Sequence, residues 1–155
     1  METKLLKPKV VPAGEGPELQ FPGEMMTGKL TAADTGEQFT VAELTVEPGF
    51  GPPPHVHQLE DEVFIIVEGQ VDFWIDGASV TAKEGTTVFA PRNVPHTYKG
   101  SGATKSRFFV FATGDNFERF IVKWIDMLNN GEFSIERAAK IGGDHGITFL
   151  PPVEP

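Results

Sequence analysis

The chain contains no cysteine among its 155 residues. This absence excludes a disulfide-stapled scaffold, a catalytic thiol, and zinc or iron–sulfur sites built on cysteine ligands. Apolar runs are also short: the longest, 63–67 and 108–112, fall far below the ~20 residues that cross a bilayer as a helix. The opening residues 1–7 contain no apolar core of signal-peptide length. We therefore expect a soluble, cytoplasmic protein.

Basic side chains are scarce. Thirteen Lys and Arg stand against 22 Asp and Glu, which gives a formal net charge of −9. Nucleic-acid phosphates are bound by clustered cationic side chains, and anionic membrane surfaces attract them as well. The composition therefore argues against nucleic acid and against a membrane surface as partners.

Glycine and proline are plentiful, at 17 and 13 residues, and hydrophobic residues make up 39% of the chain. Such a hydrophobic content is too high for a disordered chain, and the turn formers point to many short strands. Eight β-favouring runs follow one another before any helical pattern: Met25–Thr31, Gln38–Val46, Glu62–Val67, Gln70–Ile75, Ala78–Thr81, Thr86–Ala90, His96–Lys99 and Arg107–Phe111. This pattern predicts an all-β antiparallel sandwich or small barrel. Asp76-Gly77 is the sharpest hairpin signal, because both central positions of a type I′ turn need positive φ.

The period of apolar residues changes near the C-terminus. From Phe117 to Leu128 they recur at helical intervals, which predicts an amphipathic helix. Asp115 and Glu118 have the spacing of a capping box at its start. A second, shorter helix is predicted from a cap at Ser134 onward to residue 141.

Three regions follow from these patterns. Residues 1–24 form an N-terminal arm with a short edge strand near Glu18–Phe21, residues 25–113 form the barrel, and residues 114–155 form a helical tail that packs on it. The run Val63–Val67 is apolar on both faces, so we expect it to be covered on both sides. Together with the Pro-rich arm and the amphipathic tail, this run leads us to expect a homodimer.

Three of the four histidines lie at two junctions between a turn and a strand. His55 and His57 are two residues apart, so in a strand they face the same side. Glu62 reaches that same interior only if the chain turns before it and starts a new strand. His96 follows the turn-rich segment 91–95. Three neutral imidazoles and one carboxylate suit a divalent transition ion and leave positions open for water, oxygen or substrate.

Each part of this pattern also has an ordinary explanation. A His-x-His pair, or His96 alone, is more often a hydrogen-bonded histidine than a ligand, and the acidic run 60–62 could be a solvated turn. Only the joint pattern favours a metal site. His145 stands alone and is predicted to be a surface histidine, while Trp74 and Trp124 are predicted to be packing anchors.

The same residues form two motifs with fixed spacing. The first consists of Gly49, His55-Val56-His57, Glu62 and Gly69, and the second of Gly85, Pro91-Arg92-Asn93 and His96. In these positions the chain resembles a single-domain cupin, over roughly residues 25–125, and most of all the bacterial quercetin-dioxygenase-like group. Two residues depart from the pattern. Asn93 stands where that family usually has Gly, but Asn can still adopt the left-handed conformation, and Gly100 stands where it usually has Asn, which affects a turn and not the metal.

The resemblance implies a double-stranded β-helix (jelly-roll) barrel with one or two C-terminal α-helices and one divalent transition metal per chain. It assigns as metal ligands the four residues that the spacing also gives: His55, His57, Glu62 and His96. The ion could be Fe, Mn, Ni, Co, Cu or Zn, because this set of three nitrogens and one oxygen accepts all of them. In the group that the chain resembles, the metal orients an aromatic enol or phenolate for attack by dioxygen, and the glutamate can also act as a base. Glu62 is therefore the candidate catalytic residue.

A substrate pocket is expected beside the metal. Its candidate lining residues either point inward on the same strands as the ligands or belong to the buried face of the next strand. They are Phe64, Ile66, Phe73 and Tyr98. Alternatively, they only fill the barrel, as interior residues usually do. Because few basic residues lie near the motifs, a neutral or weakly acidic aromatic ligand is favoured over an anionic sugar or phosphate.

Three functions remain open at this point. The first is a metal-dependent dioxygenase that acts on a flavonol-like or other oxygenated aromatic molecule. The second is a non-catalytic barrel that binds or senses a small ligand, and the third is a non-redox cupin isomerase or decarboxylase that uses the ion as a Lewis acid. Oxygen uptake by metal-loaded protein separates the first from the other two.

Overall fold

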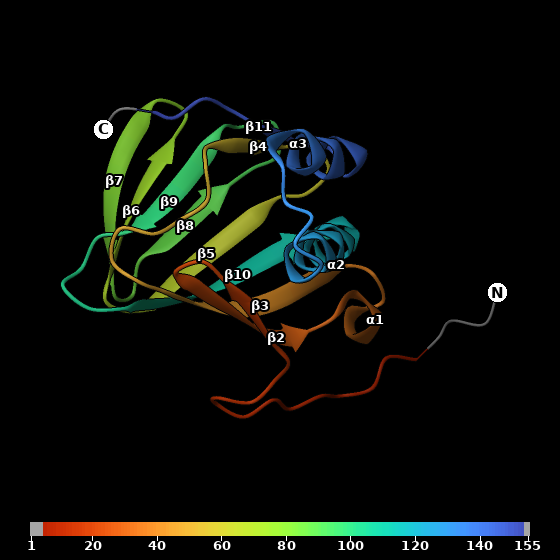
Figure 1. Cartoon of the computed structure of the whole chain (residues 1–155). Helices are drawn as coiled ribbons and strands as arrows, with labels where there is room; N and C mark the ends of the chain where they lie inside the picture. The colour runs from red at the N-terminus through yellow and green to blue at the C-terminus, as the bar shows by residue number, and fades with distance from the viewer. Residues whose placement is uncertain (1–4, 154–155) are drawn as a thin grey trace.

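Short strands separated by glycine- and proline-containing turns build two antiparallel sheets that face each other (Figure 1). The computed structural model describes residues 5–153, so residues 1–4 of the predicted arm and 154–155 of the predicted tail lie outside the described residues. The six-stranded sheet contains, in spatial order, β1 (Glu18–Phe21), β2 (Glu24–Leu30), β3 (Phe39–Val46), β10 (Ser106–Thr113), β5 (Glu62–Glu68) and β8 (Thr87–Ala90). The five-stranded sheet contains β11 (Ile147–Phe149), β4 (His55–His57), β9 (His96–Gly100), β6 (Gln70–Ile75) and β7 (Ala78–Lys83). This double-sheet barrel with C-terminal helices confirms the predicted fold class.

The predicted strands and turns are present in the structure, with small changes at their ends. All eight predicted runs are strands, and the edge strand expected near Glu18–Phe21 is β1. Asp76 and Gly77 have φ of 49° and 83° and connect β6 to β7 in a two-residue hairpin, as predicted. The very short β4 and β11 had no periodicity of their own and were not among the predicted strands.

The barrel core is aromatic. Alternate residues of β10 face inward, and among them Phe108 is fully buried between the two sheets. Its ring lies 5.1 Å from that of Tyr98, and the rings of Phe64 and Phe73 lie 5.2 Å apart. Each such pair contributes about 0.5–1.5 kcal/mol beyond the burial of its surface. The outer face of β5 is only half-buried within one chain, although cover on both sides was predicted for it.

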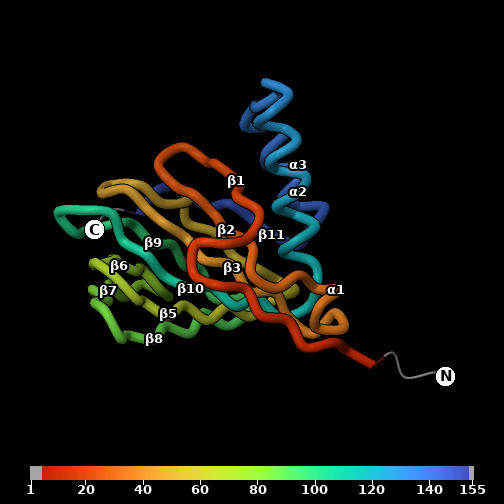
Figure 2. Tube along the Cα trace, turned by 90° about the horizontal axis from the view of Figure 1, so that it is seen from below, coloured from red at the N-terminus to blue at the C-terminus, as the bar shows by residue number. Residues whose placement is uncertain are grey.

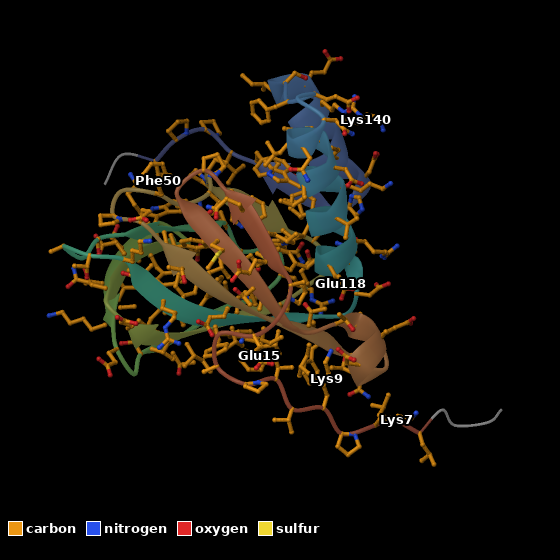
Figure 3. All side chains as sticks on the ribbon, turned by 60° about the horizontal axis from the view of Figure 1, so that its bottom comes forward. Lys7, Lys9, Glu15, Phe50, Glu118 and Lys140 are labelled. Atoms are coloured by element: carbon orange, nitrogen blue, oxygen red, sulfur yellow. The ribbon has the colours of Figure 1, made fainter. Side chains whose placement is uncertain are left out.

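Two helices follow the barrel: α2 (Asn116–Asn129) and α3 (Ile135–Asp144). Ser134 caps α3 as predicted, because its side chain accepts a hydrogen bond from the backbone of Arg137. The capping box predicted for α2 is wrong. Asp115 makes no side-chain cap, and Glu118 instead accepts a hydrogen bond of 2.7 Å from the backbone N–H of Ala32, the first residue of α1 (Ala32–Thr35). Figure 3 shows Glu118 at the end of α2 that lies nearest α1.

The helix α3 runs further than the predicted end at residue 141. It continues through Gly142 and Gly143, and Gly142 is buried against β11. A Cβ at position 142 would lie 2.8 Å from the carbonyl oxygen of Ile147, so glycine permits the close approach of β11 to the helix.

The tail closes one side of the barrel. Figures 1 and 2 both show α2 and α3 side by side, on the far side of the sheets from β7. After α3 the chain adds β11 to the edge of β4, where Ile147 and Phe149 lie opposite His57 and His55. The C-terminal tail therefore lies directly against the strand that carries the first two candidate ligands. Among the described residues, no helix is long and apolar enough to span a membrane.

Candidate metal centre

Four side chains from three strands meet in the interior of the barrel. The alternation of β4 turns His55 and His57 inward and Val56 the other way. The chain then turns and crosses to the other sheet, where Glu62 begins β5, and His96 begins β9 directly opposite His55. All four are buried, and one donor atom from each lies within 4.8 Å of the others. The structure thus brings together the four residues that the spacing singled out.

Each imidazole forms a hydrogen bond through its Nδ1 atom, on the side of the ring away from the other ligands. Nδ1 of His55 donates to the carbonyl oxygen of Pro53 at 2.8 Å, and Nδ1 of His96 donates to that of Val94 at 3.1 Å. Nδ1 of His57 lies 2.7 Å from Oε1 of Glu60. These bonds fix the ring orientations and leave the Nε2 atoms for the interior, which is the usual arrangement behind metal-binding histidines.

The inward atoms converge on one place. Nε2 of His96 and Nε2 of His57 lie 2.9 and 3.3 Å from Oε2 of Glu62. Atoms bound to one transition ion at about 2.0–2.2 Å cannot be more than about 4.4 Å apart, which is close to the spread found here. Three imidazole nitrogens and one carboxylate also form the kind of donor set that Mn, Fe, Co, Ni, Cu and Zn share. The four residues could therefore hold one divalent ion with only small side-chain movements.

The charges of the cluster suit this role. Burial lowers the pKa of His55 to about 3, and the neighbouring His96 and His57 add to the effect, so its ring is neutral at neutral pH. Burial alone would raise the pKa of Glu62, but the imidazoles of His57 and His96 outweigh it and bring the value to about 2. At neutral pH the cluster therefore offers an ionised carboxylate and an unprotonated ring at His55.

Glu60 also belongs to the candidate centre, although the sequence did not single it out. It was grouped with a solvated acidic turn, yet it is fully buried, with Oε1 on His57 and Oε2 accepting a 3.0 Å hydrogen bond from Asn116 on α2. Burial acts to lower the pKa of His57, but the Glu62 and Glu60 carboxylates outweigh it and raise that pKa. The spacing of three residues between His57 and Glu60 was visible, but an acidic triplet gives no sign of which member turns inward.

Asp61, the residue after Glu60, connects the loop of the first motif to the loop of the second. The guanidinium of Arg92 binds both carboxylate oxygens of Asp61 at 3.1 and 3.0 Å, and the backbone N–H of Arg92 donates to one of them. The next residue, Asn93, has φ of 65° and donates its backbone N–H to the carbonyl oxygen of His57. The left-handed conformation expected of Asn93 is thus confirmed. It positions the loop that leads to His96.

Gly100 has a role different from the one expected. It does not sit in a turn but ends β9, where a Cβ would lie 2.6 Å from the carbonyl oxygen of Glu47. Gly49 and Phe50 exchange backbone hydrogen bonds with Gly100 across the same contact. Glycine at position 100 therefore allows the segment before β4 to lie close against β9.

A cavity of about 260 Å³ opens beside the cluster and is lined by His55, His57 and Glu62 among others. Its walls on the barrel side come from Met26, Leu44, Phe64, Tyr98 and Val110. The helical tail supplies Phe117, Phe120, Ile121, Trp124, Ile147 and Phe149. The sequence predicted the apolar stripe of α2 but not that this stripe would face the candidate metal centre.

The predicted pocket residues divide into two pairs. Phe64 and Tyr98 line the cavity, whereas Ile66 and Phe73 are buried in the adjoining core. Trp124 packs against Phe149, with ring centroids 5.5 Å apart, and lines the cavity as well. His145, expected on the surface, is half-buried at the C-terminal end of α3, where its Nδ1 donates to the carbonyl oxygen of Ile141.

Residues 42–112 match a family model described as a Cupin domain. A segment of 92 residues is 28% identical to quercetin 2,3-dioxygenase of Bacillus subtilis (strain 168) and covers 59% of this chain but 27% of that protein. A segment of 75 residues is 33% identical to a mannose-1-phosphate guanylyltransferase of Salmonella montevideo and covers 48% of this chain and 16% of that protein. The chain thus matches only a small part of the length of these curated relatives.

Solved structures resemble the fold over about two thirds of the chain. A predicted oxalate decarboxylase from Thermotoga maritima has a TM-score of 0.65 at 21% identity, over 68% of this chain and 99% of that one. KdgF from Halomonas sp. has a TM-score of 0.63 at 15% identity, over 70% and 94%. The polyketide cyclase RemF from Streptomyces resistomycificus has a TM-score of 0.60 at 23% identity, over 69% and 80%. At these identities the likeness concerns the fold alone.

Proposed function

This chain carries a cupin domain, and we propose that it is a metal-dependent dioxygenase acting on a small oxygenated aromatic molecule. The observation that carries the proposal is the buried cluster of three histidines and one glutamate at the wall of an apolar cavity. The similarity of 92 residues to a quercetin 2,3-dioxygenase points to the same chemistry.

In the proposal, one divalent ion is held by His55, His57, Glu62 and His96. When bound, such an ion supplies Lewis acidity toward a phenolate or enolate oxygen and, if it is redox-active, electron exchange with dioxygen. The donor set itself leaves the identity of the ion open.

Glu62 has a second role in the proposal. It lines the cavity, and its lowered pKa keeps it ionised at neutral pH. A carboxylate in this place accepts a hydrogen bond from a phenolic hydroxyl that approaches the centre, and it would take the proton of that hydroxyl once a bound ion had lowered the pKa of the phenol. His55, which is neutral and buried, adds no competing positive charge.

The cavity walls select and protect the substrate. Phe64, Phe117 and Trp124 surround the space beside the ligands with aromatic surface, which excludes water and favours a flat apolar molecule. A volume of about 260 Å³ lies below the ~300–1,000 Å³ of sites for drug-sized ligands. This size favours a molecule of one or two rings over a complete flavonol.

An oxygen electrode tests the proposal. The protein is loaded in turn with Fe, Mn, Co, Ni and Cu and is given quercetin, catechol and naphthalene-2,6-diol. We expect oxygen uptake that needs both metal and substrate, that is lost in Glu62→Gln, and that persists in the exposed control Glu84→Gln. Tight binding of a phenol without uptake under any metal would instead indicate a binding or sensor barrel, and conversion without uptake would indicate a non-redox enzyme.

A further inference from the structure

A second polar group lies in the same cavity as the candidate metal centre. Glu24, the first residue of β2, and Tyr98 on β9 both line the cavity. Oε1 of Glu24 is the one buried side-chain nitrogen or oxygen without a hydrogen-bond partner in the part of the chain that the structure describes. Buried polar atoms are nearly always partnered in folded proteins, so this oxygen calls for an explanation.

The fold does not account for a glutamate at this position. No Lys, Arg or His forms an ion pair with Glu24 within residues 5–153. Burial raises the pKa of Glu24, because it disfavours the charged form, and the nearby hydroxyl of Tyr98 lowers that pKa by a smaller amount. An apolar residue would fill this place at lower cost to the fold. The carboxyl group is therefore better explained by a ligand than by the stability of the barrel.

The cavity has polar groups from two sources, with apolar surface around them. One source is the cluster of His55, His57 and Glu62, and the other is Glu24 with Tyr98. The remaining wall consists mainly of aliphatic and aromatic side chains, such as Phe64 and Val110. A ligand that satisfies both sources has a flat apolar body, an oxygen that faces the metal centre, and a hydrogen-bond donor elsewhere on its rim.

We propose that Glu24, which lines the cavity together with Tyr98, is a specificity-determining residue that accepts a hydrogen bond from a second hydroxyl group of the aromatic ligand. The proposal rests on the proposed function for the end of the ligand that faces the metal. It goes further by naming the substrate class: a one- or two-ring aromatic with two hydroxyl groups. A hydrogen bond to a carboxylate in a cavity that excludes water discriminates strongly against a ligand that lacks the donor.

Two matched probes test this assignment by calorimetry on the zinc-loaded protein, in which no oxygen chemistry competes. Naphthalene-2,6-diol has a hydroxyl at each end, whereas 6-methoxy-2-naphthol keeps the same rings and one hydroxyl but replaces the second donor by an acceptor. We expect the wild-type protein to bind the diol about tenfold or more tightly than the methoxy compound. A third probe, 6-amino-2-naphthol, shows whether an amine donor serves as well as a hydroxyl.

The variants assign the preference to its residues. Glu24→Leu removes the acceptor and is expected to abolish the preference for the diol. The isosteric Glu24→Gln has an amide that can also donate to the methoxy oxygen, so it is expected to reduce the difference in affinity between the two probes. Tyr98→Phe is expected to narrow the preference without abolishing it. Glu84→Gln, at an exposed turn residue that does not line the cavity, is the matched control and should leave it unchanged.

The outcomes separate this inference from the proposed function. A diol preference that survives in Glu24→Leu and Glu24→Gln, or a wild-type protein that binds both probes equally, overturns the role of Glu24 while oxygen uptake can still support the dioxygenase. If neither probe binds the wild-type protein, the two-hydroxyl substrate class is wrong as well. Oxygen uptake with catechol or quercetin then decides the proposed function on its own.

Discussion

Single residues behind the ligands set the chemistry of the proposed centre. The carbonyl oxygens of Pro53 and Val94 orient two of the histidines, and only His57 is oriented by a charged side chain, that of Glu60. A carboxylate behind an imidazole fixes its tautomer and makes the free nitrogen a stronger ligand. Glu60 therefore strengthens His57 as a ligand in the proposed centre.

Replacement of Glu60 by Gln is expected to weaken metal binding by about 10- to 100-fold. The amide of Gln presents a donor where both His57 and Asn116 need an acceptor, so one of the two hydrogen bonds is lost along with the negative charge. Competition with a chromophoric chelator measures the affinity for Zn or Co. Glu84→Gln is the matched control, and an unchanged affinity in Glu60→Gln would show that His57 needs no carboxylate behind it.

Glu24 is expected to make the stability of the protein depend on pH. Because burial raises its pKa above the ordinary 4.5, the folded chain binds the proton more tightly than the unfolded chain does. Stability from this group is present below pH 4.5 and is lost as the pH rises through the raised value. Glu24→Gln should therefore raise the urea midpoint at about pH 7.5 and change it little at about pH 4. A gain that is equal at both pH values would contradict this explanation.

The elements of the barrel bring distant residues to one place through close backbone packing. The strand β4 lies between β9 and β11, so the two motif strands and the C-terminal tail share one sheet edge. Asn116 adds a second connection, since its side chain donates both to Glu60 and to the carbonyl oxygen of His145. The tail is therefore coupled to the candidate metal centre.

Gly100→Ala is expected to destabilise the protein by about 1–3 kcal/mol, because its Cβ would lie 2.6 Å from the backbone oxygen of Glu47, and backbone hydrogen bonds hold both residues in place. Gly143→Ala is the opposite case. Gly143 is exposed within α3 with open space around it, so alanine there is expected to stabilise by about 0.5–1 kcal/mol. Urea unfolding measures the free energy of unfolding of both variants, and equal changes in the two would show that the contact at Gly100 is unimportant.

Local patterns were sufficient to predict most elements. The alternation in Gln70–Ile75, the Asp76-Gly77 turn and the period of Phe117–Leu128 each depend on neighbouring residues alone, and all three are present. The strand β11 could not be predicted, because a segment of three residues has no period of its own and forms a strand only by pairing with β4. The strand β4 was not among the predicted runs for the same reason, although the spacing of His55 and His57 was interpreted as strand spacing. The capping box predicted for α2 is absent, because Glu118 accepts its hydrogen bond from α1, a segment far away in the sequence.

The candidate metal centre was predictable in its inner residues only. The spacing of His55, His57, Glu62 and His96 pointed to one cluster, because strand phase and turns determine which way they face. The burial of Glu60 and the part of the cavity wall that the tail forms depend on how distant elements pack. No local pattern distinguishes such residues from solvated or ordinary core ones.

The whole molecule presents an apolar surface outside the barrel. On the outer face of the six-stranded sheet, Val63, Ile65, Phe109, Phe111 and Phe89 are cross-strand neighbours. The first four are only half-buried, and Phe89 is 58% exposed. Contiguous apolar surface of this kind is typical of an interface between chains.

We expect a homodimer that uses this face, and light scattering measures its mass. Phe89→Lys should shift the mass toward that of one chain, because a charge cannot be buried there without a partner. Wild-type protein with the mass of a single chain would contradict the expectation.

The central claim is that four side chains hold one ion beside the cavity, and elemental analysis of protein purified without a chelating tag tests it most directly. After loading with Mn, Fe, Co, Ni, Cu or Zn and removal of excess metal, we expect about one ion per chain for at least one of them. The content should fall to near zero in His57→Ala and stay unchanged in His145→Ala, which removes a histidine outside the centre. Wild-type protein that retains none of these metals, or retains them equally in His57→Ala, would contradict the account.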